Sequence, residues 1–541
     1  HYADNKLMRG DFMSGLNKRI MIIGLIFAMM FLWIIFVYFR IAANPESVDA
    51  GLEYQTVSYS VGSSDGYIYD RSLSPLVNEK HTFIAAAVPE LTDKTLIKYA
   101  CNTDEFMKGY ESGKLFTFEC EENTPESDGL TVFNVPIRYS EHQTACHAVG
   151  YISQGYGVSG IEYAYDSLLR GNADEQSVTY SADGFGNILN GIEKTVNRPD
   201  EDKSGVVMTL DKTIQKICEE AASDIECGAV VVSEVSTGDI LAMVSLPSYS
   251  TDNLAEAIND EKSPMINRCL YSYSVGSIFK LVTSAEAIIE NVDTLVYDCT
   301  GAIDVRGQAF RCHRHDGHGI QNITEATVNS CNTYFINLSG FISVPKFRET
   351  AYTLGFGREI HLCSGMTASA GVLPTEKELL IPAELANFSF GQGKLSATPL
   401  HISQLTCAIA GGGKMPVLRI IKGLTKDGET IENEKEPQYA YVLEEYIAES
   451  LKNMMTAAVY DNETANARPQ KTTAGAKTST AQTGRFNEDG LEICNAWVTG
   501  FFPSDNPEYA VTVLVEDGGY GNDSAAPIFR KIADEITKAD K

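Results

Sequence analysis

Residues 273–283 read YSVGSIFKLVT, with a serine and a lysine three residues apart at the start of an apolar run. On a helix, residues three apart are neighbours, so Ser277 and Lys280 are predicted to share one face. A serine hydroxyl beside an amine is the arrangement of a nucleophile with its own base. The same pair is also typical of a polar helix start with a solvated lysine. The rest of the chain must therefore decide between these interpretations.

Two further short motifs follow in order. Residues 330–332 read SCN within NSCNTYF, and residues 477–479 read KTS within GAKTSTAQTG, which is predicted to be a strand. Serine-x-x-lysine, serine-x-asparagine and lysine-threonine-small residue, in this order, are the motifs of penicillin-binding proteins and class A β-lactamases. Each triplet alone is uninformative. The ordered set indicates acyl transfer or hydrolysis through a serine nucleophile.

Beyond the motifs, the chain resembles class B penicillin-binding proteins over nearly all of its length after the apolar N-terminal run. The resemblance is carried by GYIYDRSLSPL from Gly66, GVSGIEYAYDSLLRG from Gly157, GDILAMVSLPSY, FSFGQGKLSATPL from Phe388, and AWVTGFFP. It implies an α/β (α+β) serine transpeptidase/β-lactamase-like fold, preceded by a mixed pedestal domain and one transmembrane helix. Asp65 stands where the family usually has arginine, and Ser479 stands where it usually has glycine.

The strand patterns themselves favour a single antiparallel sheet covered by helices. GAVVVSEVSTGDILAMVSLPSY reads as two strands, NAWVTGFFPSD and YAVTVLVED read as two more, and helical patterns dominate between them. Such a sheet would be assembled from segments distant in sequence. VNRPDEDKSG, from Val196, is polar and marks a boundary. We expect a cytoplasmic N-terminus over 1–19, a transmembrane helix over 20–39, a pedestal over 40–200 and a transpeptidase domain over 206–541.

The run IMIIGLIFAMMFLWIIFVYF, Ile20–Phe39, is uncharged and long enough to cross a bilayer as a helix, which needs about 20 residues. Lys18 and Arg19 precede the run and acidic residues follow it. The positive-inside rule therefore predicts a single-pass cell-membrane protein with a cytoplasmic N-terminus and an extracytoplasmic catalytic domain. A cleaved signal peptide is the alternative, although its apolar core is usually only about 7–15 residues long. The formal net charge of −29 argues against nucleic-acid binding.

Twelve cysteines are scattered along the chain rather than arranged as a disulfide framework. Cys299 and Cys312 flank a short glycine-containing segment and are the favoured pair if a disulfide forms. Cys312, His313, His315 and His318 offer a weak candidate metal site, because their spacing matches no standard pattern. Free or disulfide-bonded structural cysteines remain the default interpretation.

The resemblance implies that the first two motifs carry out acylation. Ser277 attacks the carbonyl of a D-Ala-D-Ala peptide, and Lys280 accepts its proton. Lys280 must be neutral for this, and burial together with the nearby charge of Lys477 would lower the pKa of its amine. Ser330 passes a proton toward the leaving amine, and Asn332 holds the substrate amide or orients Lys280.

The third motif is implied to bind the substrate. Thr478 and Thr480 offer hydroxyls to its terminal carboxylate, beside the charge of Lys477. Glycine in place of Ser479 would let the substrate backbone approach the strand closely, so the serine bears on affinity. By resemblance, the backbone N–H groups of Ser277 and Thr480 form the oxyanion hole.

The implied partners are peptidoglycan stem peptides, β-lactams, the membrane and a polytopic membrane glycan polymerase that contacts the anchor and pedestal. No cofactor is required by serine and lysine chemistry. Two alternatives stay open on the sequence: a membrane-anchored β-lactamase or D,D-carboxypeptidase, which would use the same acylation residues, and a non-catalytic sensor that binds peptidoglycan or β-lactam.

Overall fold

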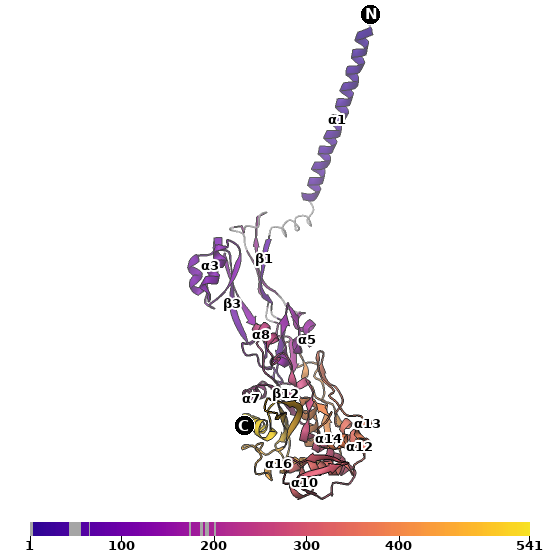
Figure 1. The fold of residues 1–541 in the computed structure, drawn as a ribbon. Helices are drawn as coiled ribbons and strands as arrows, with labels where there is room; N and C mark the ends of the chain where they lie inside the picture. Colours follow the sequence, from indigo (N-terminus) through magenta and orange to yellow (C-terminus); the bar gives the residue numbers. More distant parts are fainter. Residues whose placement is uncertain are drawn as a thin grey trace. The chain divides into compact units, whose positions relative to one another are not determined.

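The chain forms two compact units in this computed structural model (Figure 1). One unit comprises residues 1–63, 82–135 and 174–200, and the other comprises 64–81, 136–173 and 201–541. The structure describes residues 4–42, 56–63, 65–171, 175–183, 188–189, 194–199 and 202–540.

The first unit begins with a long helix, α1, Asp4–Ala42. Within it, Lys18–Ile41 is long and apolar enough to span a membrane, and no other helix among the described residues passes that test. Nearly all side chains from Ile20 to Phe39 are exposed, so no protein core in the described structure explains their apolarity. The predicted transmembrane segment is thus confirmed as one helix whose length and apolar composition suit a membrane span.

The rest of the first unit holds two small sheets. One contains β1 (Thr56–Ser63), β8 (Glu175–Ser181) and β9 (Thr195–Asn197), and the other contains β4 (Phe116–Cys120), β3 (Lys80–Ala87) and β5 (Leu130–Ile137). Helix α3, Thr103–Glu111, packs on the second sheet through Phe106, which contacts Phe116 and Phe118 edge to face. These rings form the apolar core that lets so small a sheet stay folded.

The division of the chain differs from the predicted pedestal range of 40–200, because residues 64–81 and 136–173 lie in the second unit. The reason is strand pairing. The strand β2, Tyr67–Tyr69, runs parallel to β10, Gly205–Met208, which also pairs with β22, Ile421–Thr425. Backbone hydrogen bonds thus attach part of the predicted pedestal to the second unit.

The second unit is built on a five-stranded antiparallel sheet, as predicted. Its strand order is β12-β11-β26-β25-β24, which places β24 at one edge. The strands are β11 (Gly228–Glu234), β12 (Ile240–Leu246), β24 (Gly475–Phe486), β25 (Glu492–Phe502) and β26 (Tyr509–Val515). Strands distant in sequence therefore meet in one layer, with helical segments between them.

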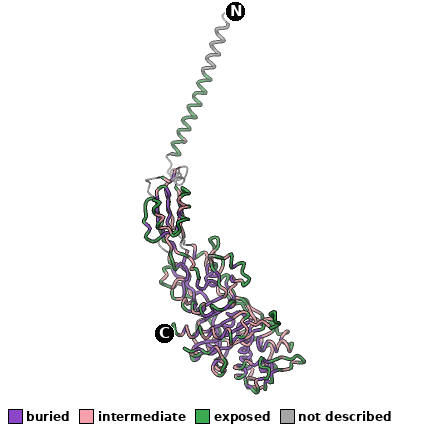
Figure 2. Tube along the Cα trace, turned by 60° about the vertical axis from the view of Figure 1, so that its left-hand side comes forward, coloured by how far each residue is buried: buried purple, intermediate pink, exposed green. Residues whose placement is uncertain are grey.

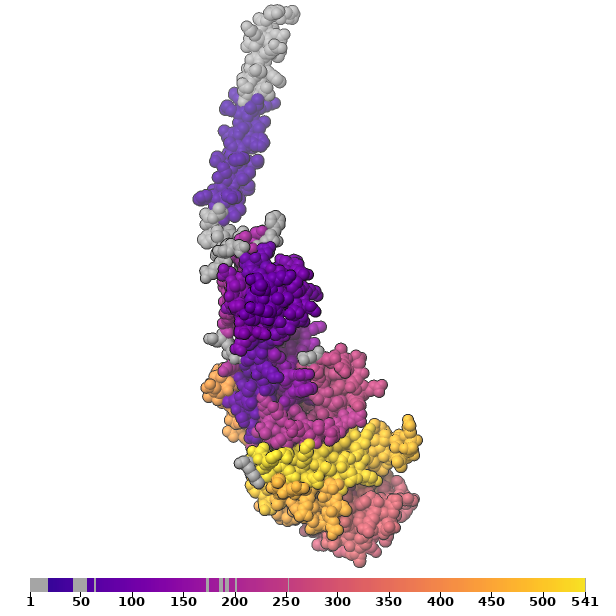
Figure 3. All heavy atoms as spheres, turned by 90° about the vertical axis from the view of Figure 1, so that its left-hand side faces the viewer, coloured from indigo at the N-terminus to yellow at the C-terminus, as the bar shows by residue number. Residues whose placement is uncertain are grey.

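Both faces of this sheet are buried, and alternate residues serve opposite cores. On β11, Ala229 and Val231 join one apolar cluster, while Val230 and Val232 join the other. The second cluster is completed by α7 (Lys212–Ala221) and α18 (Ala526–Ala539), and the yellow C-terminal segment forms a band on the surface in Figure 3. Period-two alternation with apolar clusters on both faces explains why β11, β12 and β26 are almost wholly apolar, whereas the edge strand β24 is rich in threonine and other polar residues.

The other face carries the helices that position the candidate site. They are α9 (Lys280–Ile289), α11 (Asn332–Ser339), α14 (Pro382–Ser389), α15 (Pro399–Ala410) and α16 (Glu445–Tyr460). Helix α15 is buried along nearly its whole length, and Figure 2 shows buried residues concentrated in the interior of this unit. A helix buried on every side is a rigid support for neighbouring elements.

Candidate active site

The predicted nucleophile lies in a tight turn rather than inside a regular helix. Residues Gly276–Phe279 form one 3-10 turn, and α9 starts at Lys280. Gly276 has a φ of +63°, and a Cβ added there would lie 2.3 Å from Ser479 Oγ, so only glycine fits without a shift. Ser277 is half-buried, between the buried Gly276 and Ile278.

Lys280 is fully buried, and its amine contacts two residues of the second motif. Its Nζ lies 2.6 Å from the Ser330 carbonyl oxygen, 2.8 Å from Asn332 Oδ1 and 3.2 Å from Ser330 Oγ. Two of these partners are oxygens that only accept, and the third is a hydroxyl that can donate. A neutral amine, with two N–H donors and one lone pair, satisfies all three. Burial, reinforced by the charge of Lys477, places the pKa of Lys280 well below its ordinary value.

The backbone at Ser330 explains how one residue offers two oxygens to the same amine. Ser330 has a φ of +50°, in the left-handed region that non-glycine residues rarely adopt. This turn ends just before α11, whose first residue is Asn332. Ser330 Oγ also lies 3.1 Å from Lys477 Nζ, so it bridges the two lysine amines.

Lys477 reaches this group from the edge strand β24. Its Nζ contacts Ser330 Oγ and lies 3.0 Å from the Thr478 carbonyl oxygen. Burial lowers the pKa of Lys477 to about 8. The site thus holds two buried amines around one hydroxyl, and with Lys280 neutral the positive charge of this group depends on the protonation of Lys477.

Ser479 and the two threonines of β24 differ in where their hydroxyls lie. The Ser479 hydroxyl donates a hydrogen bond of 2.8 Å to the Val275 carbonyl oxygen, and the residue is buried. Thr480 Oγ1 accepts a hydrogen bond of 3.3 Å from the Gly521 N–H, and Thr478 and Thr480 are half-buried. Ser479 therefore faces the nucleophile turn, whereas the threonines alternate with it along the strand.

The structure therefore brings together four of the predicted catalytic residues by direct hydrogen bonds, namely Lys280, Ser330, Asn332 and Lys477. Ser277 lies on the adjoining turn, but among the described residues its hydroxyl makes no hydrogen bond to Lys280 or to another group. The Lys280 amine is instead hydrogen-bonded to Ser330 and Asn332, which lie about fifty residues away in sequence.

A network that the sequence analysis missed supports the strand before the nucleophile. Arg268 Nε donates to Glu516 Oε1 at 2.9 Å, and the Tyr273 hydroxyl donates to the same oxygen at 2.7 Å. Trp497 Nε1 donates to the Ser274 carbonyl oxygen at 3.1 Å. The sequence gives no local signal for this pairing, because Arg268 and Glu516 are 248 residues apart.

The cysteines and histidines are placed differently from the sequence prediction. All twelve cysteines are described and are free thiols, so the favoured Cys299–Cys312 disulfide is wrong. Cys312 and His318 lie together with Cys299 and Cys331, the ligand atoms being within 4.8 Å of one another. His313 has its Nδ1 3.9 Å from Cys312 Sγ but, like the exposed His315, is not part of that group. The predicted set included only two of these four residues.

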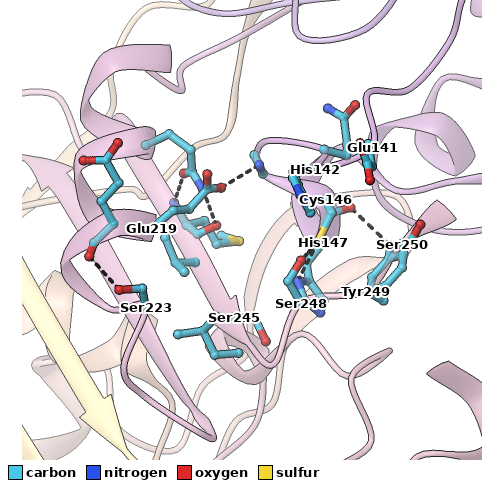
Figure 4. Close-up of a pocket in the computed structure, with 17 residues that line it drawn as sticks. Glu141, His142, Cys146, His147, Glu219, Ser223, Ser245, Ser248, Tyr249 and Ser250 are labelled. Atoms are coloured by element: carbon cyan, nitrogen blue, oxygen red, sulfur yellow. Dashed lines mark hydrogen bonds between the residues drawn. The ribbon is translucent and has the colours of Figure 1, made fainter. Parts of the chain in front are cut away.

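A cavity of about 830 Å³ lies apart from the catalytic candidates (Figure 4). It is bordered by α7, β12 and the short helix α4, Cys146–Val149. Inside it, the Glu219 carboxylate accepts hydrogen bonds of 2.8 Å from Gln215 Nε2 and from the Ala145 N–H, and burial raises its pKa. No residue of the three motifs lines this cavity, so its size does not make it the active site.

Comparison with known proteins places this geometry in context. The family model for the penicillin-binding protein transpeptidase domain matches residues 228–534, and that for the penicillin-binding protein A dimerisation domain matches 126–194. The chain is 24% identical to peptidoglycan D,D-transpeptidase MrdA of Haemophilus influenzae, over 91% of this chain and 79% of that protein. It is 30% identical to peptidoglycan D,D-transpeptidase PbpA of Mycolicibacterium smegmatis, over 72% of this chain and 82% of that protein.

Solved structures show the same fold. Penicillin-binding protein 2 from Helicobacter pylori aligns with a TM-score of 0.67 and 22% identity, over 89% of this chain and 99% of that one. The penicillin G acyl-enzyme complex of penicillin-binding protein A from M. tuberculosis aligns with a TM-score of 0.63 and 21% identity, over 88% of this chain and 100% of that one. At these identities the likeness concerns the fold.

Proposed function

The chain belongs to the penicillin-binding protein transpeptidase family, and on this premise we propose that it is a peptidoglycan D,D-transpeptidase that cross-links stem peptides through an acyl-enzyme on Ser277. β-Lactams acylate the same serine. One observation carries the proposal: the hydrogen-bonded group of Lys280, Ser330, Asn332 and Lys477 next to the turn that holds the half-buried Ser277.

Acylation begins when Ser277 Oγ attacks the carbonyl carbon of the penultimate D-alanine. The hydroxyl proton passes to Lys280, which burial keeps neutral. In the described arrangement the Lys280 amine is hydrogen-bonded to Ser330 and Asn332, and the hydrogen bond from the Ser277 hydroxyl to this amine forms in the complex with substrate. Catalytic hydrogen bonds commonly tighten in this way on substrate binding.

Collapse of the tetrahedral intermediate breaks the bond to the terminal D-alanine. Its amine takes a proton from Ser330 Oγ, which draws a replacement from Lys280 or Lys477 through the hydrogen bonds of 3.2 and 3.1 Å. Backbone N–H groups of Ser277 and Thr480 stabilise the oxyanion. An amine of a second stem peptide then attacks the ester carbonyl, forms the cross-link and releases Ser277.

The terminal carboxylate of the substrate binds at the edge strand β24. Protonated Lys477 supplies the charge, and the hydroxyls of Thr478 and Thr480 donate hydrogen bonds. Thr480 accepts from the Gly521 N–H, which leaves its own proton free to donate. Because β24 lies at the sheet edge, its outer backbone groups are also available to pair with an extended peptide.

The test is the intact mass of the purified chain after exposure to benzylpenicillin. A stable adduct on the parent chain and none on Ser277→Ala is the expected result, because a transpeptidase deacylates slowly with water. An adduct that forms and disappears within a turnover would instead identify a β-lactamase. No adduct at any concentration would overturn the acyl-enzyme proposal. Cross-linking of pentapeptide substrates by the parent chain would separate transfer from carboxypeptidase hydrolysis.

We also propose that α1 anchors the chain with its N-terminus in the cytoplasm and its catalytic unit outside. The support is Lys18 and Arg19 before the span and acidic residues after it. A protease added to spheroplasts is expected to digest the catalytic unit but not an epitope placed at the N-terminus. Protection of the catalytic unit would overturn this orientation.

A polytopic membrane glycan polymerase is the proposed partner of the anchor and the pedestal, 40–200. The apolar surface of α1 is exposed all round, so it can contact a partner helix as well as lipid. Replacing residues 20–39 with an unrelated transmembrane helix is expected to abolish copurification with the polymerase while leaving penicillin acylation unchanged. Undiminished copurification would show that the anchor is not part of the interface with the polymerase.

A further inference from the structure

The cavity of about 830 Å³ lies wholly within the second unit and outside the three motifs. Its walls come from three segments, namely α7 with the turn that follows it, the end of β12 with residues 248–250, and residues 141–147. Small-molecule sites usually enclose about 300–1,000 Å³, so the cavity is large enough to hold a ligand. The proposed acyl transfer uses none of the residues that line it.

Carboxylates line this cavity without a lysine or an arginine to balance them. Glu141, Glu219 and Glu220 belong to its wall, and no lysine or arginine among the described residues does. Of the two histidines in the wall, His142 is exposed and His147 is buried. Burial lowers the pKa of His147 to about 4, so this imidazole adds no positive charge. The charge of the cavity therefore favours a cationic ligand over an anionic one.

The carboxylate of Glu219 has one oxygen to spare. Its Oε1 accepts hydrogen bonds of 2.8 Å from both Gln215 Nε2 and the Ala145 N–H. Its Oε2 accepts no hydrogen bond from the residues that the structure describes, and it is not sealed from solvent. Burial raises the pKa of Glu219, opposed in part by the charge of Lys216, which lies outside the cavity wall. A cation beside Oε2 would stabilise the ionised carboxylate.

Hydrogen bonds hold both sides of the cavity in place. Gln215 Oε1 accepts a hydrogen bond of 2.8 Å from the Met243 N–H, which fixes the amide that donates to Glu219. The Tyr249 hydroxyl donates a hydrogen bond of 3.2 Å to the Cys146 carbonyl oxygen. Figure 4 shows Glu219 and Tyr249 on different sides of the cavity. The site is therefore formed before a ligand arrives, as small-molecule sites usually are.

The rest of the wall decides which kind of cation fits. Met243, Val244, Leu246 and Tyr249 give it apolar surface. The carboxylates of the cavity do not converge on one point as metal ligands do, since the described residues hold no such group here. An aliphatic ammonium suits both parts of the wall, because its N–H groups can donate to Glu219 Oε2 while its methylene stem lies on the apolar side chains.

We propose that this cavity binds an ammonium group carried on an aliphatic stem, with Glu219 as its ionic partner. The source of that group rests on the proposed function: it is the side-chain amine of an uncross-linked stem peptide, the group that accepts the acyl chain. Cross-linking converts this amine into an uncharged amide, so the cavity binds the uncross-linked peptide and not the product. Stem peptides recur along a glycan strand, so one held here keeps its neighbours near the catalytic residues.

The first test is calorimetric titration of the full chain in detergent with the dipeptide Nα-acetyl-L-lysyl-D-alanine amide. This probe carries the amine but no D-Ala-D-Ala bond, so it cannot acylate Ser277. We expect a Kd of about 1 mM or below. Acetylation of the lysine amine should weaken binding at least about tenfold, because the charge-assisted hydrogen bond is lost.

Variants of Glu219 assign the binding to the cavity. Glu219→Gln keeps the shape of the side chain and an acceptor oxygen, and it should weaken binding of the free amine at least about tenfold. Glu219→Asp keeps the charge and should bind more tightly than Glu219→Gln, which separates loss of charge from misfolding. Glu463→Gln is the matched control and should bind as the parent chain does, since Glu463 is exposed and outside the cavity.

A photoreactive diazirine form of the dipeptide locates the bound probe directly. Peptide mapping after irradiation is expected to find the label within residues 141–147, 215–223 or 243–250. Label confined to the three motifs would overturn the proposal. So would equal binding of the acetylated dipeptide, equal binding by Glu219→Gln, or no binding at about 10 mM.

Two further measurements separate this inference from others. Cadaverine carries the same ammonium chemistry and is expected to bind more weakly than the dipeptide, whereas equal affinity would assign the cavity to free polyamines and overturn the stem-peptide source. Ser277→Ala should bind the dipeptide as the parent chain does while forming no benzylpenicillin adduct. Failure of the acyl-enzyme and failure of amine binding are therefore distinguishable.

Discussion

Ser479 Oγ donates a hydrogen bond of 2.8 Å to the carbonyl oxygen of Val275, two residues before the proposed nucleophile. The hydroxyl that glycine would lack thus joins the edge strand β24 to the turn that presents Ser277. Ser479 is only 2% exposed, and its hydroxyl is engaged by the turn that presents the nucleophile.

Replacing Ser479 is therefore expected to affect stability more than drug binding. Ser479→Ala leaves the buried Val275 carbonyl without its donor and should lower the free energy of unfolding by about 1–3 kcal/mol. The benzylpenicillin acylation rate of Ser479→Gly should stay within about threefold of the parent chain, a shift below 1 kcal/mol. Denaturant unfolding and acylation kinetics check the two expectations. A tenfold rise in the acylation rate of the glycine variant would show instead that the serine obstructs the cleft.

Gly276→Ala should be strongly destabilising for two separable reasons. The alanine Cβ would lie 2.3 Å from Ser479 Oγ, and the φ of +63° costs a non-glycine residue about 1–2 kcal/mol. The double variant Gly276→Ala/Ser479→Gly removes the clash and keeps the backbone strain. Its unfolding free energy should therefore lie between those of the parent chain and Gly276→Ala. No recovery in the double variant would mean that backbone strain accounts for the whole loss.

Much of this site was predictable because its chemistry lies in short motifs and its sheet in period-two patterns. Lys280, Ser330 and Lys477 meet as their motif order predicts. The contact of the Lys280 amine with Asn332 was one of the two roles that the resemblance implied for that residue. Its contacts with the two oxygens of Ser330 were not predictable, because they are set by the left-handed turn there.

The cysteine cluster was missed for a related reason. Cys312 was grouped with the nearest histidines by sequence spacing, whereas the side chains that lie around it in the structure are set by position in space. Cys299 enters through the pairing of β14 with β17, and Cys331 was hidden as the variable residue of a catalytic motif. The attachment of residues 64–81 to the catalytic unit likewise depends on a parallel strand pairing between Tyr67–Tyr69 and Gly205–Val207. Local patterns carry no information on such long-range pairings.

Acylation should depend on pH through the two lysines with opposite signs. Lys280 must be neutral, so the rate rises as pH increases through its lowered pKa. Lys477 must be charged to bind the substrate carboxylate, so the rate falls as pH increases through about 8. The rate of benzylpenicillin acylation, measured across pH, is therefore expected to give a bell-shaped profile. Lys477→Arg should move the alkaline limb upward, because a guanidinium stays protonated; an unmoved limb would assign it to another group.

The free energy of unfolding should increase with pH over the alkaline range in which the acylation rate falls. The pKa of Lys477 is about 8 in the folded chain and near its ordinary value of 10.5 when unfolded, so the unfolded chain binds more protons between these values. The free energy of unfolding should therefore increase as pH rises from about 8 toward 10.5, until other groups titrate. Lys477→Met removes one of the two buried amines with a lowered pKa, so it should reduce this increase and leave the part that Lys280 contributes. An equal slope in both proteins would show that Lys477 is not its source.

The ion pair between Arg268 and Glu516 predicts that residues outside the three motifs also affect the position of the nucleophile. Glu516→Gln leaves the buried Arg268 guanidinium without its carboxylate and weakens the hydrogen bond that holds Tyr273. It should therefore lower the free energy of unfolding by about 3–5 kcal/mol, as breaking a buried ion pair does. The neighbouring Asp517 pairs with Arg485 on the surface, and Asp517→Asn is the matched control, expected to cost less than about 1 kcal/mol. Denaturant unfolding compares the two variants, and acylation kinetics should show slower reaction only for Glu516→Gln, because Tyr273 lies on the strand that leads into Ser277. Equal small losses in both variants would mean that the pair does not support the turn.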